Sequence, residues 1–314
     1  MTEDKFFQQV YSLKEQLKFS GSFSADLEKI DNIVVSGMGG SGVAGRIFST
    51  YFKIKPVLVL DSYDLPDYVD KNSFFIAISY SGNTEEVLSV VNKARKKGIK
   101  IHSITSGGEL ETLSDEVIKV PSGLQPRAAI GYLLMPLLNT FTHISSGDIE
   151  ETISLLTELE SSRAPIAQLA QRISESGKIP YILAWEPFSS LSYRFKTQFN
   201  ENSKMFALTH VLSEQNHNEL VPMLMNEDMR SKFYYLVVDG DSGSRNQNRM
   251  NIVETESHLE FSHLKARGNT FFQKLFYILH YIDLLTVHIA LKNSYDPEDV
   301  RVLENLKKNL KNIR

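Results

Sequence analysis

Three hydroxyl side chains between residues 79 and 84 could together bind an anion. They follow an apolar segment at 74–79, which has the composition of a strand buried on both faces of a parallel sheet. The hydroxyls are those of Ser79, Ser81 and Thr84. Residues 85–91 then have helical spacing, and a helix N-terminus offers a phosphate unpaired N–H groups and a partial positive charge. The alternative is an ordinary helix that Ser81 or Asn83 caps.

A second candidate ligand loop lies nearer the N-terminus. A short apolar strand leads into the sequence GMGGSG at residues 37–42 and then into a helix. Glycines permit positive φ and let a ligand approach the backbone, so Gly39, Gly40 and Ser41 are candidate binding residues. The loop also resembles a dinucleotide fingerprint with Asp61 as its acidic residue, but a dinucleotide site would not explain the serine-rich loop.

Residues that could move a proton occur in the second half of the chain. Glu201 lies in a polar turn before an apolar segment, so its carboxylate could be partly buried and act as a base. His217 lies in a polar loop, and a histidine can protonate or deprotonate a sugar hydroxyl near neutral pH. Lys307 belongs to the last turns of a C-terminal helix. Taken singly, each of the three is more simply explained as a surface residue, the lysine complementing the helix dipole.

A parallel sheet would bring the two ligand loops together. The first half of the chain follows the order βαβαβαβ, which predicts a parallel sheet with helices on both faces. The expected strands are 32–36, 57–60, 74–79, 100–104 and 116–120. Ligands bind such sheets at the carboxyl ends of the strands, so the polar loops at 37–42, 79–84 and 105–108 should share one edge. Arg127 begins a helix at this edge, where we expect it to contact an anion.

The second half is predicted to be a degenerate α/β copy of the first, and we place the domains at residues 1–150 and 151–314. The expected strands are 179–184, 233–238 and 258–261, and the expected helices are 149–160, 166–174, 189–199, 244–254, 271–292 and 299–312. The loop at 185–187 contains an acid and no glycine, so it would receive a phosphate poorly. We therefore expect one phosphate site per chain.

The composition limits the possible partners and chemistry. The 314 residues are 42% apolar and 23% charged, as in ordinary globular proteins, and the net charge of -4 argues against nucleic acid or an anionic membrane as the main partner. The absence of cysteine excludes disulfides and thiol catalysis, and the histidines lack the spacing of a zinc enzyme, so we expect no metal. No signal-peptide core is found, and polar residues interrupt the apolar segment 271–291, so we expect a cytoplasmic protein.

Together, the motifs resemble those of the bifunctional phosphoglucose/phosphomannose isomerases, a family of the SIS-domain superfamily of phosphosugar isomerases. The sequence SYSGNTEE at residues 79–86 marks the superfamily. The matches that point to this family are PSGLQPRAA at 121–129, NENSK at 200–204 and NHNEL at 216–220. Further matches are GMGGSG at 37–42, SGG at 106–108 and the segment 296–310. These motifs occur in the family's order and span nearly the whole chain.

The resemblance implies two SIS-type domains and an aldose–ketose isomerase that acts on glucose 6-phosphate, fructose 6-phosphate and mannose 6-phosphate. The residues that would hold the sugar phosphate are Ser41, Ser79, Ser81 and Thr84. Glu201 would carry a proton between C1 and C2 through a cis-enediol, and Arg127 would stabilise the enediolate. His217 and Lys307 would assist ring opening. In this family the histidine comes from the other subunit of a homodimer, and neither a metal nor another cofactor is used.

Two other hypotheses remain open from the sequence. A non-catalytic phosphosugar-binding regulator would need neither Glu201 nor His217, and such regulators usually carry a DNA-binding helix-turn-helix, which we do not find before the first domain. A nucleotide-dependent dehydrogenase would rest on GMGGSG alone. In the resemblance to this family, Val300 stands where some members carry a threonine linked to the mannose substrate. Valine keeps the bulk of threonine and lacks its hydroxyl.

Overall fold

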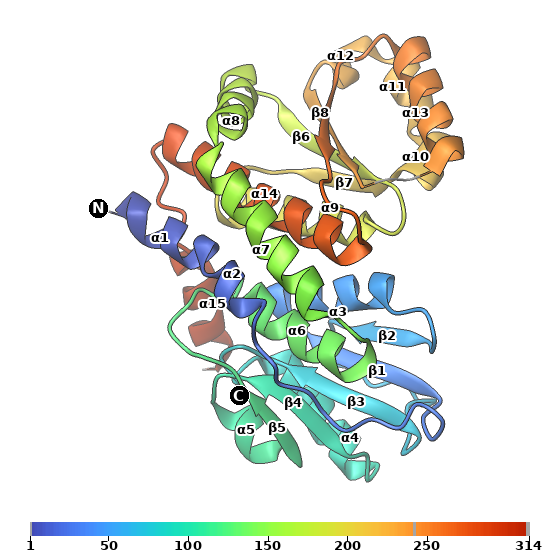
Figure 1. The fold of residues 1–314 in the computed structure, drawn as a ribbon, viewed down its shortest axis with the longest axis vertical. Coiled ribbons are helices and arrows are strands. Elements are labelled where there is room, and N and C mark those ends of the chain that lie inside the picture. Colours follow the sequence, from blue (N-terminus) through green and yellow to red (C-terminus); the bar gives the residue numbers. More distant parts are fainter. Residues whose placement is uncertain (1, 241–242, 312–314) are drawn as a thin grey trace.

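Two parallel sheets with helices packed between them form the fold of residues 2–240 and 243–311, which a computed structural model describes (Figure 1). The first sheet has the strand order β2-β1-β3-β4-β5. Its strands are β1 (Asn32–Gly37), β2 (Val57–Leu60), β3 (Ser73–Ile78), β4 (Ile101–Thr105) and β5 (Glu116–Lys119). All of them pair in parallel, which confirms the predicted sheet.

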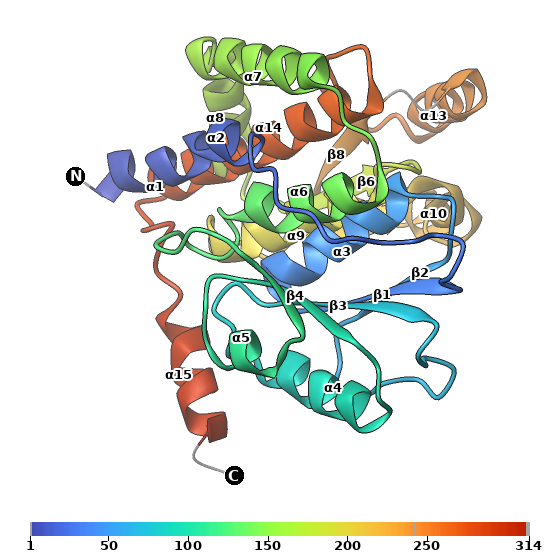
Figure 2. The same cartoon turned by 60° about the horizontal axis from the view of Figure 1, so that its bottom comes forward.

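Helices cover both faces of the first sheet, as predicted. The face toward the second sheet carries α3 (Gly39–Tyr51) and α6 (Ile130–Phe141), and the outer face carries α4 (Glu85–Lys96) and α5 (Glu109–Leu113) (Figure 2). Strand β3 is buried along its whole length. Phe74 and Ile76 face the core shared with α3 and α6, whereas Phe75 and Ala77 face the core beneath α4. A strand between two helical layers must be apolar on both sides, which explains its uninterrupted apolar sequence.

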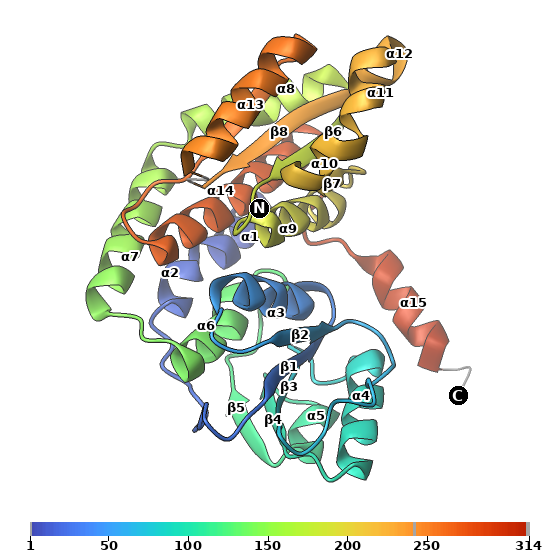
Figure 3. The same ribbon diagram turned by 90° about the vertical axis from the view of Figure 1, so that its right-hand side faces the viewer.

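The second sheet is also parallel, with the strand order β7-β6-β8-β9. Its strands are β6 (Ile179–Ala184), β7 (Leu208–Val211), β8 (Phe233–Asp239) and β9 (Phe261–Lys265). Its inner face packs on α9 (Ser189–Glu201) and α14 (Phe271–Lys292), and α7 (Ser146–Ser161) and α8 (Ala164–Ser176) pack on α14. The outer face carries α10 (Leu212–Asn218), α11 (Leu220–Met225), α12 (Glu227–Arg230) and α13 (Gly243–Ser257) (Figure 3).

The N-terminal helices pack between the two halves of the fold, and the C-terminal helix stands away from it. Helix α1 (Thr2–Tyr11) packs on α14, and the short α2 (Leu13–Gln16) packs on α6, so the N-terminal segment joins the two halves. Helix α15 (Arg301–Lys311) stands apart from both helical layers (Figure 3), and its residues 301–306 are exposed.

Helix α14 has the length and apolarity of a membrane span, but 78% of its most apolar window is buried, as in the core helix of a globular fold.

Several element boundaries differ from the sequence predictions. Strand β7 was not predicted, because it is a short edge strand with two polar residues in its middle and therefore lacks a clear apolar pattern. The strand predicted at 258–261 runs from Phe261 to Lys265, because α13 continues to Ser257. No helix joins β2 to β3, where the described residues 61–72 form turns and bends, so the order βαβαβαβ is wrong at this connection.

The glycine-rich segment also differs from the prediction. Helix α3 already begins at Gly39, so Gly39, Gly40 and Ser41 form its first turn and do not belong to a loop. Glycine is a poor helix former, which is why the sequence pattern placed the helix start several residues later. The difference matters for function, because it moves these residues onto a helix N-terminus.

Candidate active site

The loop between β3 and α4 is held in one shape by the loop that follows β4. Gly82 has a φ of +68°, and a Cβ at this position would lie 1.7 Å from the carbonyl oxygen of Gly107. Only glycine fits there. The backbone N–H and the hydroxyl of Ser106 both donate to the carbonyl oxygen of Tyr80, at 3.0 and 2.6 Å. The predicted meeting of these two loops at one edge of the sheet is therefore confirmed.

The three hydroxyls of the β3–α4 loop differ in exposure. Ser79 is only 1% exposed, and its Oγ lies 2.8 Å from Oγ1 of Thr84. Ser81 is exposed, and its Oγ accepts a hydrogen bond from the N–H of Asn83 at 3.3 Å. Thr84 occupies the N-cap position of α4, yet its side chain makes no capping hydrogen bond. The alternative of a helix capped by Ser81 or Asn83 is thus wrong, and α4 presents a helix N-terminus without a side-chain cap.

The start of α3 lies against the segment that leads into α6. A Cβ on Gly40 would come within 3.0 Å of the carbonyl oxygen of Pro126 and 3.1 Å of Cα of Arg127. Ser41 is buried in the first turn of α3, and no side chain caps this helix either. Helices α3 and α4 lie on opposite faces of the first sheet, but both begin without a side-chain cap at the carboxyl ends of β1 and β3, which are neighbouring strands. Such an arrangement can bind a phosphate through backbone N–H groups.

Arg127 extends from this edge toward the end of α9. Its side chain is buried, and Nε donates to Oδ1 of Asn202 at 2.7 Å, while Nη1 lies 3.5 Å from Oε2 of Glu201. Nη2 donates to the carbonyl oxygen of Pro297, and the ring of Phe6 lies 5.1 Å from the guanidinium carbon. Burial lowers the pKa of Arg127, and the carboxylate of Glu201 counteracts this effect. An arginine starts from so high a pKa that the group remains a cation.

Glu201 is the last residue of α9, and its side chain is 29% exposed. A carboxylate that solvent or substrate can reach therefore stands beside a buried cation. Lys204 follows in the left-handed region, with a φ of +56°, and its Nζ donates to the carbonyl oxygen of Glu201 at 2.6 Å. Burial, and then the charge of Arg127, lower the pKa of Lys204. Sequence reasoning assigned no role to Lys204 or to Asn202, although both belong to the NENSK motif.

Two predicted catalytic residues are not placed beside Arg127 and Glu201. His217 lies exposed on α10, at the outer side of the second sheet, and it takes part in none of the described contacts of Glu201 or Arg127. Lys307 belongs to α15, but its side chain lies outside the residues that the structure describes. The described chain thus brings together Arg127, Glu201 and the first turn of α3, and leaves His217 apart.

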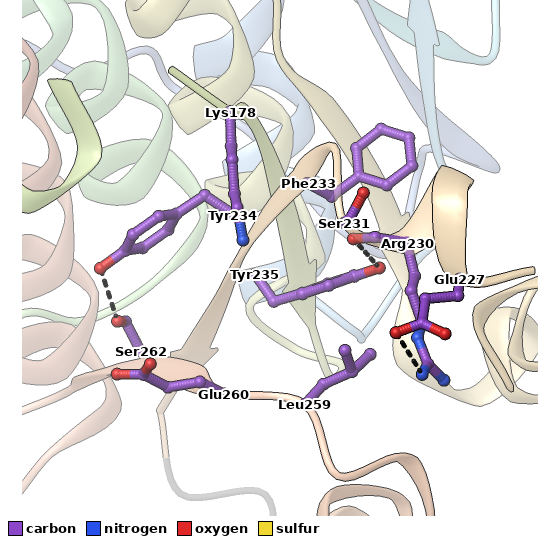
Figure 4. Close-up of a pocket in the computed structure, with 10 residues that line it drawn as sticks. All are labelled: Lys178, Glu227, Arg230, Ser231, Phe233, Tyr234, Tyr235, Leu259, Glu260 and Ser262. Carbon is purple, nitrogen blue, oxygen red and sulfur yellow. Dashed lines mark hydrogen bonds and ion pairs between the residues drawn. The ribbon is translucent and has the colours of Figure 1, made fainter. Parts of the chain in front are cut away.

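A separate cavity of about 220 Å³ lies at the amino ends of β6, β8 and β9 (Figure 4). Lys178, Arg230 and Tyr235 line it, together with Glu227, which lies 3.9 Å from Arg230. None of the predicted site residues line this cavity, and parallel sheets bind ligands at the opposite ends of their strands, so we do not place the substrate there.

Over the described ranges, no group of three or more His, Asp or Glu residues is arranged to hold a metal ion.

Two family models match the chain: the SIS domain at residues 26–142, and the C-terminal SIS domain of bacterial phospho-glucose isomerase at residues 163–310. Among solved structures, the C-terminal domain of glucosamine-fructose-6-phosphate aminotransferase from Francisella tularensis superposes with a TM-score of 0.72 over 94% of this chain and 96% of that chain. The sequence identity is 16%, so this similarity concerns the fold alone. The prediction of two SIS-type domains is confirmed.

Curated relatives match over nearly their whole length. The bifunctional phosphoglucose/phosphomannose isomerase of Thermoplasma acidophilum is 43% identical over 98% of this chain and 97% of the relative. The enzyme of the same name from Caldicellulosiruptor bescii is 34% identical over 98% and 99% of the two chains. Because the identity is this high along nearly the full length of both aligned chains, the chain belongs to the family of bifunctional phosphoglucose/phosphomannose isomerases.

Proposed function

We propose that the protein interconverts glucose 6-phosphate and fructose 6-phosphate, and also mannose 6-phosphate and fructose 6-phosphate. The observation that most supports this reaction is the pair formed by Glu201 and Arg127, whose Oε2 and Nη1 lie 3.5 Å apart. A proton next to a carbonyl group is only weakly acidic, so a carboxylate can remove it at a useful rate only where nearby positive charge stabilises the enediolate. A non-catalytic regulator would have no need of an accessible base beside a buried cation.

The proton transfer needs a single base. Glu201 takes the proton from C2 of the open-chain aldose, and the C–H electron pair forms the C1–C2 double bond of a cis-enediol. The carbonyl pair moves onto O1, where Arg127 stabilises the charge, and the hydroxyl proton of O2 passes to O1. As the C2=O2 carbonyl forms, C1 takes the proton back from Glu201 to give the ketose. Each aldose–ketose conversion is thus complete without a redox partner, because one carbon is oxidised while its neighbour is reduced.

The phosphate end of the substrate is assigned to the helix N-termini of α3 and α4. Ser81 and Thr84 offer hydroxyls at the start of α4, with Ser79 behind them, and Ser41 lies in the first turn of α3. A Cβ at Gly39 would meet no atom within 4 Å, so a phosphate can approach the backbone closely there. Binding energy from this remote group positions C1 and C2 beside the base.

Ser81→Ala is expected to raise KM for glucose 6-phosphate about tenfold and to change kcat by less than about twofold, because it removes one hydrogen bond to a charged group. Steady-state kinetics with Ser89→Ala as the control test this, since Ser89 lies further along α4 and donates only to the carbonyl oxygen of Tyr63. An unchanged KM for Ser81→Ala would contradict the phosphate assignment.

We further propose that the active enzyme is a homodimer in which His217 serves the partner's site and, with Lys307, assists ring opening. Large apolar side chains are exposed around β7 and α11: Phe206 is 87% exposed and Met225 is 82% exposed. Strand β7 lies at the edge of its sheet, so its outer backbone groups are unpaired within the sheet. An exposed apolar surface beside a free sheet edge is typical of an interface, and α10, which carries His217, packs on β7.

A hybrid dimer tests this arrangement. Co-expression of Glu201→Gln and His217→Ala chains with different affinity tags allows the hybrid to be purified. If His217 acts across the interface, the hybrid has one complete site and about half the turnover of the unaltered dimer, whereas each variant alone has very little. A hybrid without activity would place His217 in its own subunit's site, and failure to recover any hybrid would contradict the dimer.

The reaction itself is tested by coupled assays with glucose 6-phosphate, fructose 6-phosphate and mannose 6-phosphate in the presence of a chelator. We expect each conversion to proceed, because the proposed mechanism uses no metal. Activity that is lost with chelator and recovered with a divalent cation would indicate a metal-dependent isomerase. Binding of the three sugars without any conversion would favour the regulatory alternative.

Two broader expectations accompany this function. We propose the division of the chain at residue 150, with the phosphate-binding loops in residues 1–150 and the base in residues 151–314. We also propose that the enzyme works in the cytoplasm, since phosphorylated sugars are retained within cells by their charge.

A further inference from the structure

A buried polar contact between α9 and α14 leads from the interior of the fold to Arg127. Arg194, Gln198 and Asn202 occur at intervals of four residues, so they line one face of α9 up to the residue after its end. Asp283 and Thr286 face them from α14. All five side chains are buried, in a helix pair whose other inward positions are mostly apolar.

We propose that Thr286 and Asp283 are positioning residues for the isomerase reaction, which orient Arg127 through its side chain and through its backbone carbonyl respectively. This inference rests on the proposed role of Arg127 in stabilising the enediolate. Neither residue contacts Glu201, and each acts on Arg127 through one intermediary, Asn202 for Thr286 and Arg194 for Asp283.

Thr286 holds the amide of Asn202 in the orientation that Arg127 requires. The Thr286 hydroxyl donates to the carbonyl oxygen of Ile282 at 2.9 Å, so its lone pairs are left to accept from Nδ2 of Asn202 at 3.0 Å. With Nδ2 engaged, Oδ1 of Asn202 faces Nε of Arg127 at 2.7 Å. A reversed amide would set two donors against each other, because the arginine Nε–H can only donate. One hydroxyl on α14 thus orients the guanidinium through a single amide.

Asp283 acts on the backbone of Arg127. Both of its carboxylate oxygens accept hydrogen bonds from Nη2 of Arg194, at 2.8 and 2.7 Å, and Oδ1 also accepts one from Gln198 at 2.7 Å. The same Nη2 of Arg194 donates to the carbonyl oxygen of Arg127 at 3.0 Å. The carbonyl and the Nε of Arg127 are therefore both attached to α14, the first through Arg194 of α9 and the second through Asn202, which follows α9.

The cost of burying these groups argues that they do more than stabilise the fold. Apolar side chains of similar size would pack between two helices at no desolvation cost, and buried ion pairs are often no more stabilising than such replacements. The polar contacts converge on a residue whose guanidinium must be held at a fixed distance from the substrate, and small misplacements of such groups lower turnover strongly.

Kinetics of Thr286→Val and Thr286→Ser test the inference. The valine has the shape of threonine without the hydroxyl, so we expect kcat for glucose 6-phosphate to fall about 10- to 100-fold, with KM changed less than about twofold. The serine keeps the hydroxyl, and it should restore kcat to within about threefold of the unaltered enzyme. Thr152→Val is the matched control, because Thr152 is an equally buried threonine whose hydroxyl donates only to the carbonyl oxygen of Asp148 in α7.

The outcomes separate positioning from stability and from the role of Arg127. A Thr286→Val enzyme that melts at a lower temperature but retains kcat would overturn the inference, as would equal losses in the valine and serine variants. The double variant Thr286→Val/Arg127→Ala should have nearly the same kcat as Arg127→Ala alone, since the group to be positioned is gone. Near-normal turnover of Arg127→Ala itself would overturn the proposed role of Arg127. If kcat falls strongly in Arg127→Ala but not in Thr286→Val, only the positioning role of Thr286 would be overturned.

Asp283→Asn provides a second variant that acts through the other intermediary. It keeps the shape of the side chain and leaves Arg194 without a charged partner, so the contact with the Arg127 carbonyl should loosen. We expect the same pattern of lower kcat and nearly constant KM in the folded fraction, measured by active-site titration against protein that retains its circular dichroism. A change in KM alone would contradict the proposal.

Discussion

Glu201→Gln is expected to lower turnover of glucose 6-phosphate and mannose 6-phosphate about 10²- to 10⁴-fold, which is the contribution usual for a general base. Glutamine keeps the shape of the side chain at the end of α9, but its amide cannot accept the C2 proton. The phosphate assignment involves other residues, at the starts of α3 and α4, so binding of fructose 6-phosphate should persist. Coupled assays give kcat, and isothermal titration with fructose 6-phosphate gives the affinity.

Proton exchange distinguishes loss of the base from a general loss of structure. Incubation of glucose 6-phosphate in deuterium oxide with the unaltered enzyme should exchange the C2 proton, whereas Glu201→Gln should leave it in place. Glu254→Gln is a suitable control, because Glu254 has a similarly exposed side chain and also pairs with a neighbouring group, His263, on the far side of the second sheet. Near-normal turnover or exchange in Glu201→Gln would show that another group is the base.

Arg127→Ala is expected to lower kcat about 10²- to 10³-fold, the range seen when one preorganised donor to a developing anion is removed. The variant also leaves Oδ1 of Asn202 without its partner, and the carbonyl oxygen of Pro297 keeps only the longer contact from Nζ of Lys204, at 3.4 Å. Each buried polar group left unpaired costs about 1–3 kcal/mol of stability, so the melting temperature should fall as well. Turnover must therefore be measured well below the melting temperature of the variant.

Two comparisons isolate the role of the guanidinium in catalysis. Arg127→Lys keeps the charge but has no planar fork, so it cannot serve Asn202, Glu201 and Pro297 together, and we expect only partial activity. Added guanidine should rescue Arg127→Ala in part. Arg163→Ala is the control for lost stacking, because Arg163 lies over the ring of Phe7 much as Arg127 lies over that of Phe6. Full activity in Arg127→Ala would contradict the proposed mechanism.

Local patterns in the sequence were sufficient to predict the parallel sheet and the edge where the ligand loops meet. Strand β3 is recognisable because a strand buried on both faces must be apolar throughout, and its residues 74–78 are. Parallel pairing then places the ends of β1, β3 and β4 together without further information. Strand β7 and the start of α3 were missed for the opposite reason: tertiary packing gives a regular structure to residues whose own preferences are weak or contrary.

The sequence by itself thus determined the fold class, the edge of the sheet where the polar loops meet and, through the family motifs, the set of candidate residues. It could not determine which of them meet. Arg127 and Glu201 are separated by 74 residues, and Asn202 and Thr286 by 84, so their contacts depend on how α6, α9 and α14 pack between the sheets. Packing of this kind follows from the shapes of many apolar side chains at once, and no short motif encodes it. Tertiary structure alone placed a reachable carboxylate beside a buried guanidinium, and it kept His217 away from both.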